Sequence, residues 1–178
     1  MSHPIPALPM KGALALKVFI FFAFAYVLSY AFRSVNAVIA PELMADLQIS
    51  NAQLGLLSAV YFIGFSAMQI PLGIALDKFG VRRVESVLLL IALMGTIIFA
   101  LAESLLGLSI GRLLIGIGVS ACLMAAFTAY RRWFALEQQG QLASAMLVFG
   151  TVGALMTTVP VQLSLPYIGW RGIFLVMA

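Results

Sequence analysis

Charged residues in this chain stand in small clusters between long runs that contain none. One run, from Leu54 to Leu76, is 23 residues long and has no formal charge. A helix of that length measures about 34 Å at ~1.5 Å per residue, which is enough to cross a hydrocarbon core of ~30 Å. Only 9% of all residues are charged and 63% are hydrophobic, whereas roughly a quarter of the residues in a globular domain are charged. This pattern excludes a soluble domain and places the chain in a bilayer.

The apolar runs predict an all-α integral membrane protein with six spans. The first run continues towards Ala40 without the small-residue cleavage pattern of a signal peptide, so we expect a retained helix. Ser50 and Gln53 form a capping box at the start of the second run. The last run offers about 10 Å of helix, a third of a crossing, so the sixth span is incomplete. We expect an amino-terminal segment over residues 1–12 and a transmembrane unit over 13–178, with spans near 14–40, 54–76, 86–102, 105–130, 142–162 and 172–178.

The positions of the cations predict the orientation of these spans, because cytoplasmic loops are enriched in Lys and Arg. Alternate connections carry the cations, and the connections between them carry Glu42, Asp46, Glu103 and a single clear cation, Arg171. We therefore expect a cytoplasmic amino terminus and cytoplasmic loops near 77–85 and 131–141. The cations behind this prediction are Lys11, Lys17, Lys78, Arg82, Arg83, Arg131 and Arg132.

The residue inventory argues against catalysis. The sequence has one cysteine, Cys122, and one histidine, His3, so neither a disulfide nor a metal cluster can form within the chain. All carboxylates lie near span ends, and we expect none to be buried for proton coupling. The cations lie in short loops and indicate topology, not a nucleic-acid partner. We expect no enzyme activity and no cofactor, with the lipid bilayer and a small solute as partners.

The connection between the second and third runs contains glycines, an aspartate and cations at fixed spacing. A glycine four residues before the aspartate shares its helix face and lets a neighbouring helix approach closely. A second glycine can adopt the positive φ that a tight turn needs. A generic basic loop would explain the cations alone. The segment resembles the Gly-x-x-x-Asp-Arg/Lys-x-Gly-x-Arg/Lys-Arg/Lys signature of the major facilitator superfamily, filled here by Gly73, Asp77, Lys78, Gly80, Arg82 and Arg83.

Two further segments are similar to motifs of that superfamily. The run 111–118 resembles its fourth-helix motif, with Arg112, Gly116 and Gly118 in place, and 169–174 resembles the start of its sixth helix. The resemblance implies a twelve-helix transporter of two halves that works by alternating access. This chain would supply most of the amino-terminal six-helix bundle, truncated in the sixth helix, and its partner would be the missing carboxy-terminal half. The resemblance also implies a conformational gate at 73–83 and a coupling or packing role for Arg112.

A polar stripe on the first span predicts a binding surface. Tyr26, Tyr30, Arg33 and Asn36 project within an arc of about 120° on an otherwise apolar helix. An uncompensated arginine inside a membrane is costly and marks a pathway or a paired interior position. An interfacial role stays open, because Arg33 is ~12 Å from Pro41 along the helix and close enough to snorkel or to pair with an acid beyond it.

The segment 30–41 is similar to the Tyr-x-x-Arg-x-Asn-x-x-x-Ala-x-Pro stretch of organic-anion and organophosphate carriers in the superfamily. In that resemblance, Arg33 meets an anionic substrate. Gly150 and Gly153 occur in the fifth run, where they favour helix packing, but Pro160 follows Val159 and not the glycine that drug and proton antiporters carry there.

The sequence therefore predicts a secondary transporter of a small polar solute, favouring an organic anion, in a bacterial inner membrane. Two alternatives stay open. One is a receptor or assembly partner that keeps the fold without transporting, and the other is an exporter of drugs or other solutes.

Overall fold

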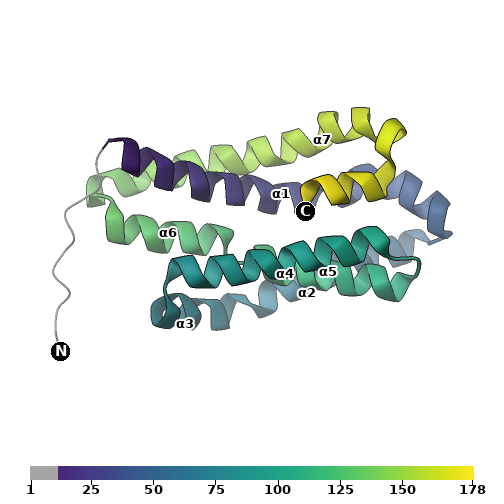
Figure 1. Ribbon diagram of the computed structural model, residues 1–178, viewed down its shortest axis with the longest axis horizontal. Coiled ribbons are helices and arrows are strands. Elements are labelled where there is room, and N and C mark those ends of the chain that lie inside the picture. The colour runs from purple at the N-terminus through teal and green to yellow at the C-terminus, as the bar shows by residue number, and fades with distance from the viewer. Residues whose placement is uncertain (1–11) are drawn as a thin grey trace.

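The computed structural model describes residues 12–178 as a bundle of helices that run along one common direction (Figure 1). The predicted segment 1–12 falls almost entirely outside the described residues. The helices are α1 (Ala13–Leu47), α2 (Asn51–Ala67), α3 (Gln69–Phe79), α4 (Val81–Leu101), α5 (Leu105–Val119), α6 (Cys122–Trp133) and α7 (Gln139–Met177), with a short 3-10 turn at Leu136–Gln138.

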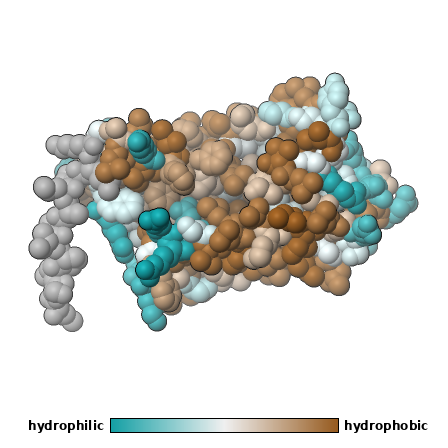
Figure 2. All heavy atoms as spheres, viewed as in Figure 1, coloured by the Kyte–Doolittle hydropathy of each residue, from teal (hydrophilic) through white to brown (hydrophobic). Residues whose placement is uncertain are grey.

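Long apolar surfaces on the outside of the bundle fit a membrane environment. Four helical stretches of the described residues are long and apolar enough to cross a bilayer: Ala13–Leu47, Val81–Leu101, Leu105–Trp133 and Leu136–Met177. The pair α2 and α3, bent by 42° at its break, supplies a fifth. Hydrophobic residues cover the middle of the bundle and hydrophilic residues gather at its two ends (Figure 2). The fold class is therefore the predicted all-α membrane bundle.

Local sequence signals set the connections between helices. Ser50 accepts from the backbone N–H of Gln53, and the Gln53 side chain accepts from the N–H of Ser50, so the predicted capping box is confirmed. Gly80 joins α3 to α4 with φ 81°, the positive φ predicted for the turn. Gly169, at φ 64°, turns the chain inside α7 and separates its last stretch from the rest.

The helices differ from the predicted spans in extent and continuity. Helix α1 passes through Pro41 to Leu47, and α7 continues through Pro160 and Pro166 before the bend at Gly169. The second predicted span is divided at Met68, and the fourth is divided at 120–121. A missing proline N–H costs one backbone hydrogen bond, which an otherwise well-packed membrane helix tolerates.

Glycines allow three helix pairs to approach closely. A Cβ added at Gly118 of α5 would lie 2.3 Å from the Ala92 nitrogen on α4, and one at Gly116 would lie 2.2 Å from the Tyr61 oxygen on α2. On α7, a Cβ at Gly153 would lie 2.4 Å from the Val27 oxygen of α1. The expectation that Gly116, Gly118 and Gly153 are packing positions is confirmed, since no side chain fits at any of them.

Candidate substrate site

Arg33 projects from α1 into a group of aromatic rings. Its guanidinium carbon lies 4.9 Å from the ring centre of Tyr30, 5.1 Å from that of Phe65 and 5.7 Å from that of Phe62. Its Nε is buried and has no hydrogen-bond partner among the described residues. Aromatic faces attract a cation but accept no directed hydrogen bond from the guanidinium fork. The surrounding rings therefore leave the guanidinium donors of Arg33 unsatisfied.

The predicted tyrosines lie beside Arg33. Tyr26 and Tyr30 meet edge to face at 5.0 Å between ring centres. Helix α7 fixes these rings, because a Cβ at Gly150 would lie 2.8 Å from Tyr26 Cε1 and 3.0 Å from Tyr30 Cε2. Gly150 thus has the packing role expected of it and holds both tyrosines in place.

Among the described residues, no acid pairs with Arg33 as the interfacial alternative would require. Asp46, one of the two acids considered for it, instead pairs with Arg171 and accepts from the Trp170 indole N–H at 3.1 Å. Arg171 also donates to the Ala102 carbonyl at 3.2 Å, so this cluster joins the ends of α1, α4 and α7. Within residues 12–178 the Arg171–Asp46 contact is the one ion pair, and Arg33 is free of a carboxylate.

The structure adds Tyr61, a residue that the polar stripe on the first span does not include. It lies on α2, is 2% exposed, and its hydroxyl has no hydrogen-bond partner among the described residues. Tyr61 contacts the rings of Phe62 and Phe65, the same two rings that lie against the Arg33 guanidinium. A signal was present, since Tyr61, Phe62 and Phe65 place three aromatic residues within five positions of an uncharged span.

Asn36 belongs to a different cluster from Arg33. Its amide nitrogen donates to Ser58 Oγ at 3.0 Å, and its amide oxygen accepts from an Arg112 guanidinium nitrogen. Both polar ends of Asn36 are therefore engaged inside the bundle. The structure brings Tyr26, Tyr30 and Arg33 together and directs Asn36 towards Arg112.

Arg112 is enclosed by the bundle. It is 1% exposed and donates to the Phe32 carbonyl at 3.0 Å as well as to Asn36. Its guanidinium carbon lies 4.8 Å from the ring centre of Phe99 and 5.4 Å from that of Phe174. Because these contacts join α1, α5, α4 and the last stretch of α7, Arg112 connects four segments without meeting an acid.

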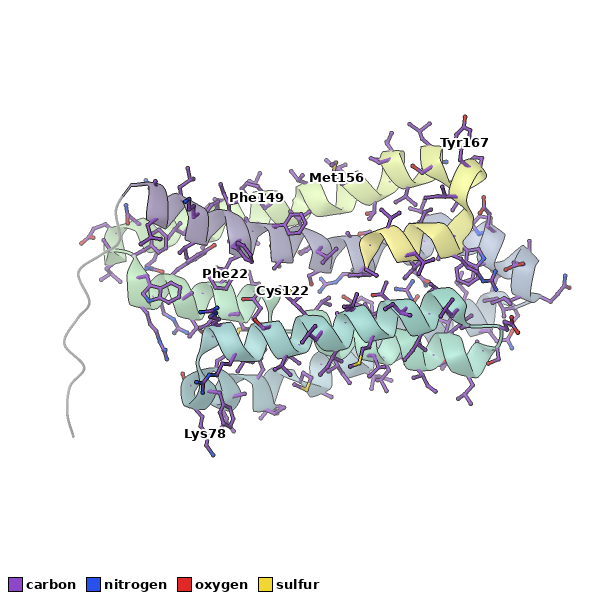
Figure 3. All side chains as sticks on the ribbon, in the orientation of Figure 1. Phe22, Lys78, Cys122, Phe149, Met156 and Tyr167 are labelled. Atoms are coloured by element: carbon purple, nitrogen blue, oxygen red, sulfur yellow. The ribbon has the colours of Figure 1, made fainter. Side chains whose placement is uncertain are left out.

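The predicted gate residues lie at one end of the bundle. Asp77, Lys78, Arg82 and Arg83 are all exposed around the turn at Gly80. A Cβ at Gly73 would meet no atom within 4 Å, so this face of α3 is open. Lys78 points outward at the end opposite Tyr167 (Figure 3). The gate cluster is therefore separate from the residues around Arg33.

One expectation about the carboxylates is wrong. Glu85, treated as the boundary of the third span, lies inside α4 and is only 8% exposed. Its Oε1 is buried and has no hydrogen-bond partner among the described residues. Because α4 begins at Val81 and not after Glu85, Glu85 is the fifth residue of the helix and its side chain faces the bundle.

The fold and the motifs have counterparts among known proteins. The family model described as Major Facilitator Superfamily matches residues 22–178. The chain is 30% identical over 152 residues to a Cupriavidus necator protein named "Probable sulfoacetate transporter SauU", covering 85% of this chain and 35% of that protein. It is 27% identical to the hexuronate transporter of Escherichia coli K12, covering 84% of this chain and 35% of the relative.

A solved structure shares the architecture. The crystal structure of a bacterial homolog of the human lysosomal transporter Spinster, inward-facing and occupied, superposes with a TM-score of 0.83. At 20% identity it covers 94% of this chain and 42% of that one, so the likeness concerns the fold.

The chain spans about a third of the length of the curated relatives described above. Its apolar helices and its bacterial transporter relatives mark it as a multi-pass protein of the bacterial inner membrane. The family match covers nearly all of the described residues, and the motifs at 73–83 and 111–118 fall inside it. The chain therefore belongs to the Major Facilitator Superfamily.

Proposed function

We propose that this chain is the amino-terminal half of a secondary transporter that moves a small organic anion by alternating access. The observation that carries the proposal is Arg33, a guanidinium among three aromatic rings with no carboxylate beside it. A guanidinium binds a carboxylate or sulfonate through fixed, paired donors, and this attraction strengthens in a low-dielectric cavity. The relatives named for sulfoacetate and hexuronate, both anions, support the same solute class.

Tyr61 and Tyr30 complete the proposed site. The Tyr61 hydroxyl, which has no partner among the described residues, supplies a donor in the same aromatic cluster, and the Tyr30 ring orients the guanidinium. Phe62, on the same side of α2, is 46% exposed, so the site lies at the surface of this half. In the proposal, the second half covers this surface and closes the cavity. Tyr26 packs against the Tyr30 ring, and Asn36 fixes the position of α1 through its hydrogen bonds to Ser58 and Arg112. We assign no catalytic step to these residues.

Asp77 has a different proposed role, as a latch between the two halves. It is exposed and has no ion pair among residues 12–178, while the adjacent face at Gly73 is open. A carboxylate at this place can interact with a helix N-terminus or a cation of the other half. Asp77→Asn in the full-length protein should lower the rate of solute uptake several-fold and leave solute affinity nearly unchanged. A selective loss of affinity would contradict the latch.

Uptake by the full-length protein in proteoliposomes tests the function. We expect uptake of an anion such as sulfoacetate or a hexuronate, and none of the corresponding neutral hexose. Arg33→Lys keeps the charge but loses the paired donors, so binding should weaken by about tenfold, the value of one charge-assisted hydrogen bond. Arg33→Ala should weaken it further.

Arg131→Ala is the matched control, because Arg131 is an exposed cation at the end of α6. It should bind and transport like the wild type. Normal anion binding by both Arg33 variants would contradict the proposed binding role of Arg33 and indicate a structural one. Binding without any uptake would favour the alternative of a receptor that keeps the fold.

A further inference from the structure

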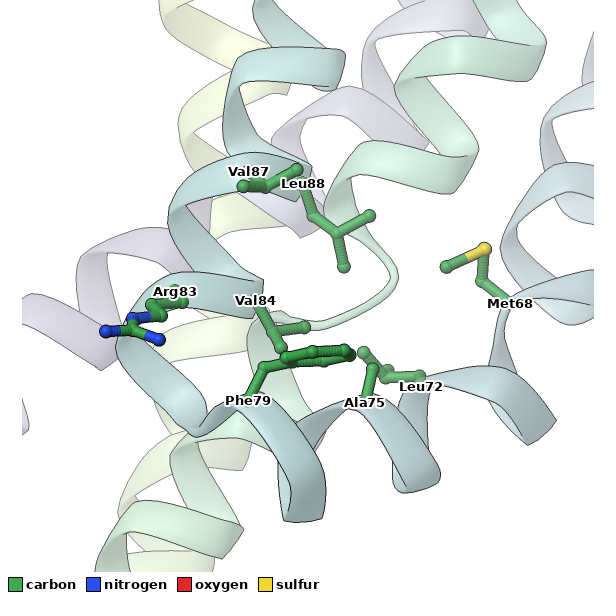
Figure 4. A pocket seen from close by; sticks show the side chains of 8 residues that line it. All are labelled: Met68, Leu72, Ala75, Phe79, Arg83, Val84, Val87 and Leu88. Carbon is green, nitrogen blue, oxygen red and sulfur yellow. The ribbon is translucent and has the colours of Figure 1, made fainter.

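An apolar groove lies between α3 and α4, away from the proposed solute site. It has a volume of about 360 Å³, within the ~300–1,000 Å³ range of ligand pockets. Its walls are side chains of the two helices that meet at Gly80, and Figure 4 shows Met68 at one end of the group and Arg83 at the other. The lining residues are Met68, Leu72, Ala75, Phe79, Arg83, Val84, Val87 and Leu88.

The groove is long enough for part of an acyl chain. Its lining residues extend over about 16 Å of α3, from Phe79 to Met68, and over about 7 Å of α4, from Arg83 to Leu88, at ~1.5 Å per residue. Phe79 lies beside the charged turn at the end of the bundle, whereas Met68 lies at the break between α2 and α3. The groove therefore runs from the polar boundary towards the bilayer midplane, as an acyl chain does.

The groove faces away from the side of α3 that carries the gate motif. At 100° per residue, Met68, Leu72, Ala75 and Phe79 fall within about 60° of one another, and Gly73 and Asp77 lie about 150° from their centre. The face at Gly73 is the open one assigned above to the second half. The groove side instead adjoins exposed apolar residues of α4, including Val87 at 57% and Leu90 at 58% exposure. This surface continues the lipid-facing belt.

The cation at the polar end of the groove favours a ligand with an anionic group there. Arg83 is exposed at the polar end of the groove and makes no ion pair among residues 12–178. A phosphate next to this guanidinium would be bound by paired donors. Anionic lipids of the cytoplasmic leaflet attract such juxtamembrane cations.

We propose that this groove binds one anionic phospholipid, with an acyl chain between α3 and α4 and its phosphate on Arg83. The site is independent of the proposed solute site, because it shares no residue with the cluster around Arg33. The lipid would fill the space between the gate helix α3 and α4 and so support the position of the loop at Gly80.

Native mass spectrometry of the full-length protein tests the proposal, with lipid retention measured for phosphatidylglycerol and for phosphatidylcholine of the same acyl chains. The wild type should retain one phosphatidylglycerol in preference to phosphatidylcholine. Arg83→Gln should reduce that preference about fivefold, the equivalent of ~1 kcal/mol for one surface cation. Ala75→Trp should remove the retained lipid of both kinds, because the indole occupies the groove.

Each variant has a neighbour as its control. Arg82→Gln removes the adjacent exposed cation, which does not line the groove. Ile74→Trp adds an indole on α3 at a residue that is 68% exposed and does not line the groove. Both controls should retain phosphatidylglycerol like the wild type. If Ala75→Trp does not assemble, Ala75→Leu narrows the groove with a smaller side chain and should lower retention. Equal losses in Arg82→Gln and Arg83→Gln, or unchanged retention when Ala75 is enlarged, would overturn the proposal.

Discussion

At the scale of single residues, the two intramembrane arginines differ in what surrounds their guanidinium groups. Arg112 donates to a carbonyl and an amide inside the bundle and is 1% exposed. Both arginines contact aromatic rings and have a buried Nε without a partner among the described residues, but Arg33 makes none of the hydrogen bonds that the terminal nitrogens of Arg112 make. Because a buried cation must be compensated, the contacts of Arg112 are structural, whereas those of Arg33 leave room for a ligand.

Arg112→Lys should therefore destabilise the protein. Lysine keeps the charge but cannot reach the Phe32 carbonyl and the Asn36 amide with a planar fork, and a lost hydrogen bond to a charged group costs about 2 kcal/mol. The free energy of unfolding, measured by titrating the full-length protein with SDS, checks this. Arg82→Lys, at an exposed position, should stay within about 0.5 kcal/mol of the wild type. Equal stability of the two variants would mean that the Arg112 contacts contribute nothing.

At the scale of helices, α4 and α5 pack through backbone contact at glycines. A Cβ at Gly118 would lie 2.3 Å from the Ala92 nitrogen and 2.5 Å from its Cβ. Gly118→Ala must push the two helices apart, and overpacking of this kind costs about 1 to 3 kcal/mol. The same SDS titration should show that loss.

Gly55→Ala is the control, because Gly55 is helical and has no atom within 4 Å of its Cβ position. Alanine there should stabilise by up to about 1 kcal/mol. A stabilised Gly118→Ala would exclude a tight α4–α5 contact.

The helices also show which features the sequence could predict. The charge-free runs and the turn glycine Gly80 were sufficient to predict the membrane bundle and its sharpest connection, because both follow from local chemistry. The break at Met68 was missed although Pro71 marks it, because a proline has no N–H for the Ala67 carbonyl four residues back and its ring crowds that group. The prediction for Glu85 is wrong because its charge does not mark a span boundary, since the helix begins four residues earlier. Tyr61 depends on long-range contacts, so periodicity on α2 alone could not connect it to Arg33.

At the scale of the whole molecule, the two ends of the bundle differ in charge. Lys78, Arg82 and Arg83 lie around the turn between α3 and α4, and Arg131 and Arg132 lie in the last turn of α6 at the same end (Figure 1). The opposite end carries Asp46 and Arg171, which neutralise each other, and Glu103. This separation is what the positive-inside rule requires of a cytoplasmic end and an outer end.

Cysteine labelling tests the resulting topology. Cys122 is fully buried, and Cys122→Ser removes it as a background thiol. Lys78→Cys and Glu103→Cys lie beyond opposite ends of α4, whose 21 residues span about 31 Å. In intact cells an impermeant maleimide should label Glu103→Cys, whereas Lys78→Cys should react only after the membrane is opened. Tyr167→Cys, 88% exposed at the outer end, should behave like Glu103→Cys. Labelling of Lys78→Cys in intact cells would place the cation-rich end outside, and the gate motif could not then act on the cytoplasmic side.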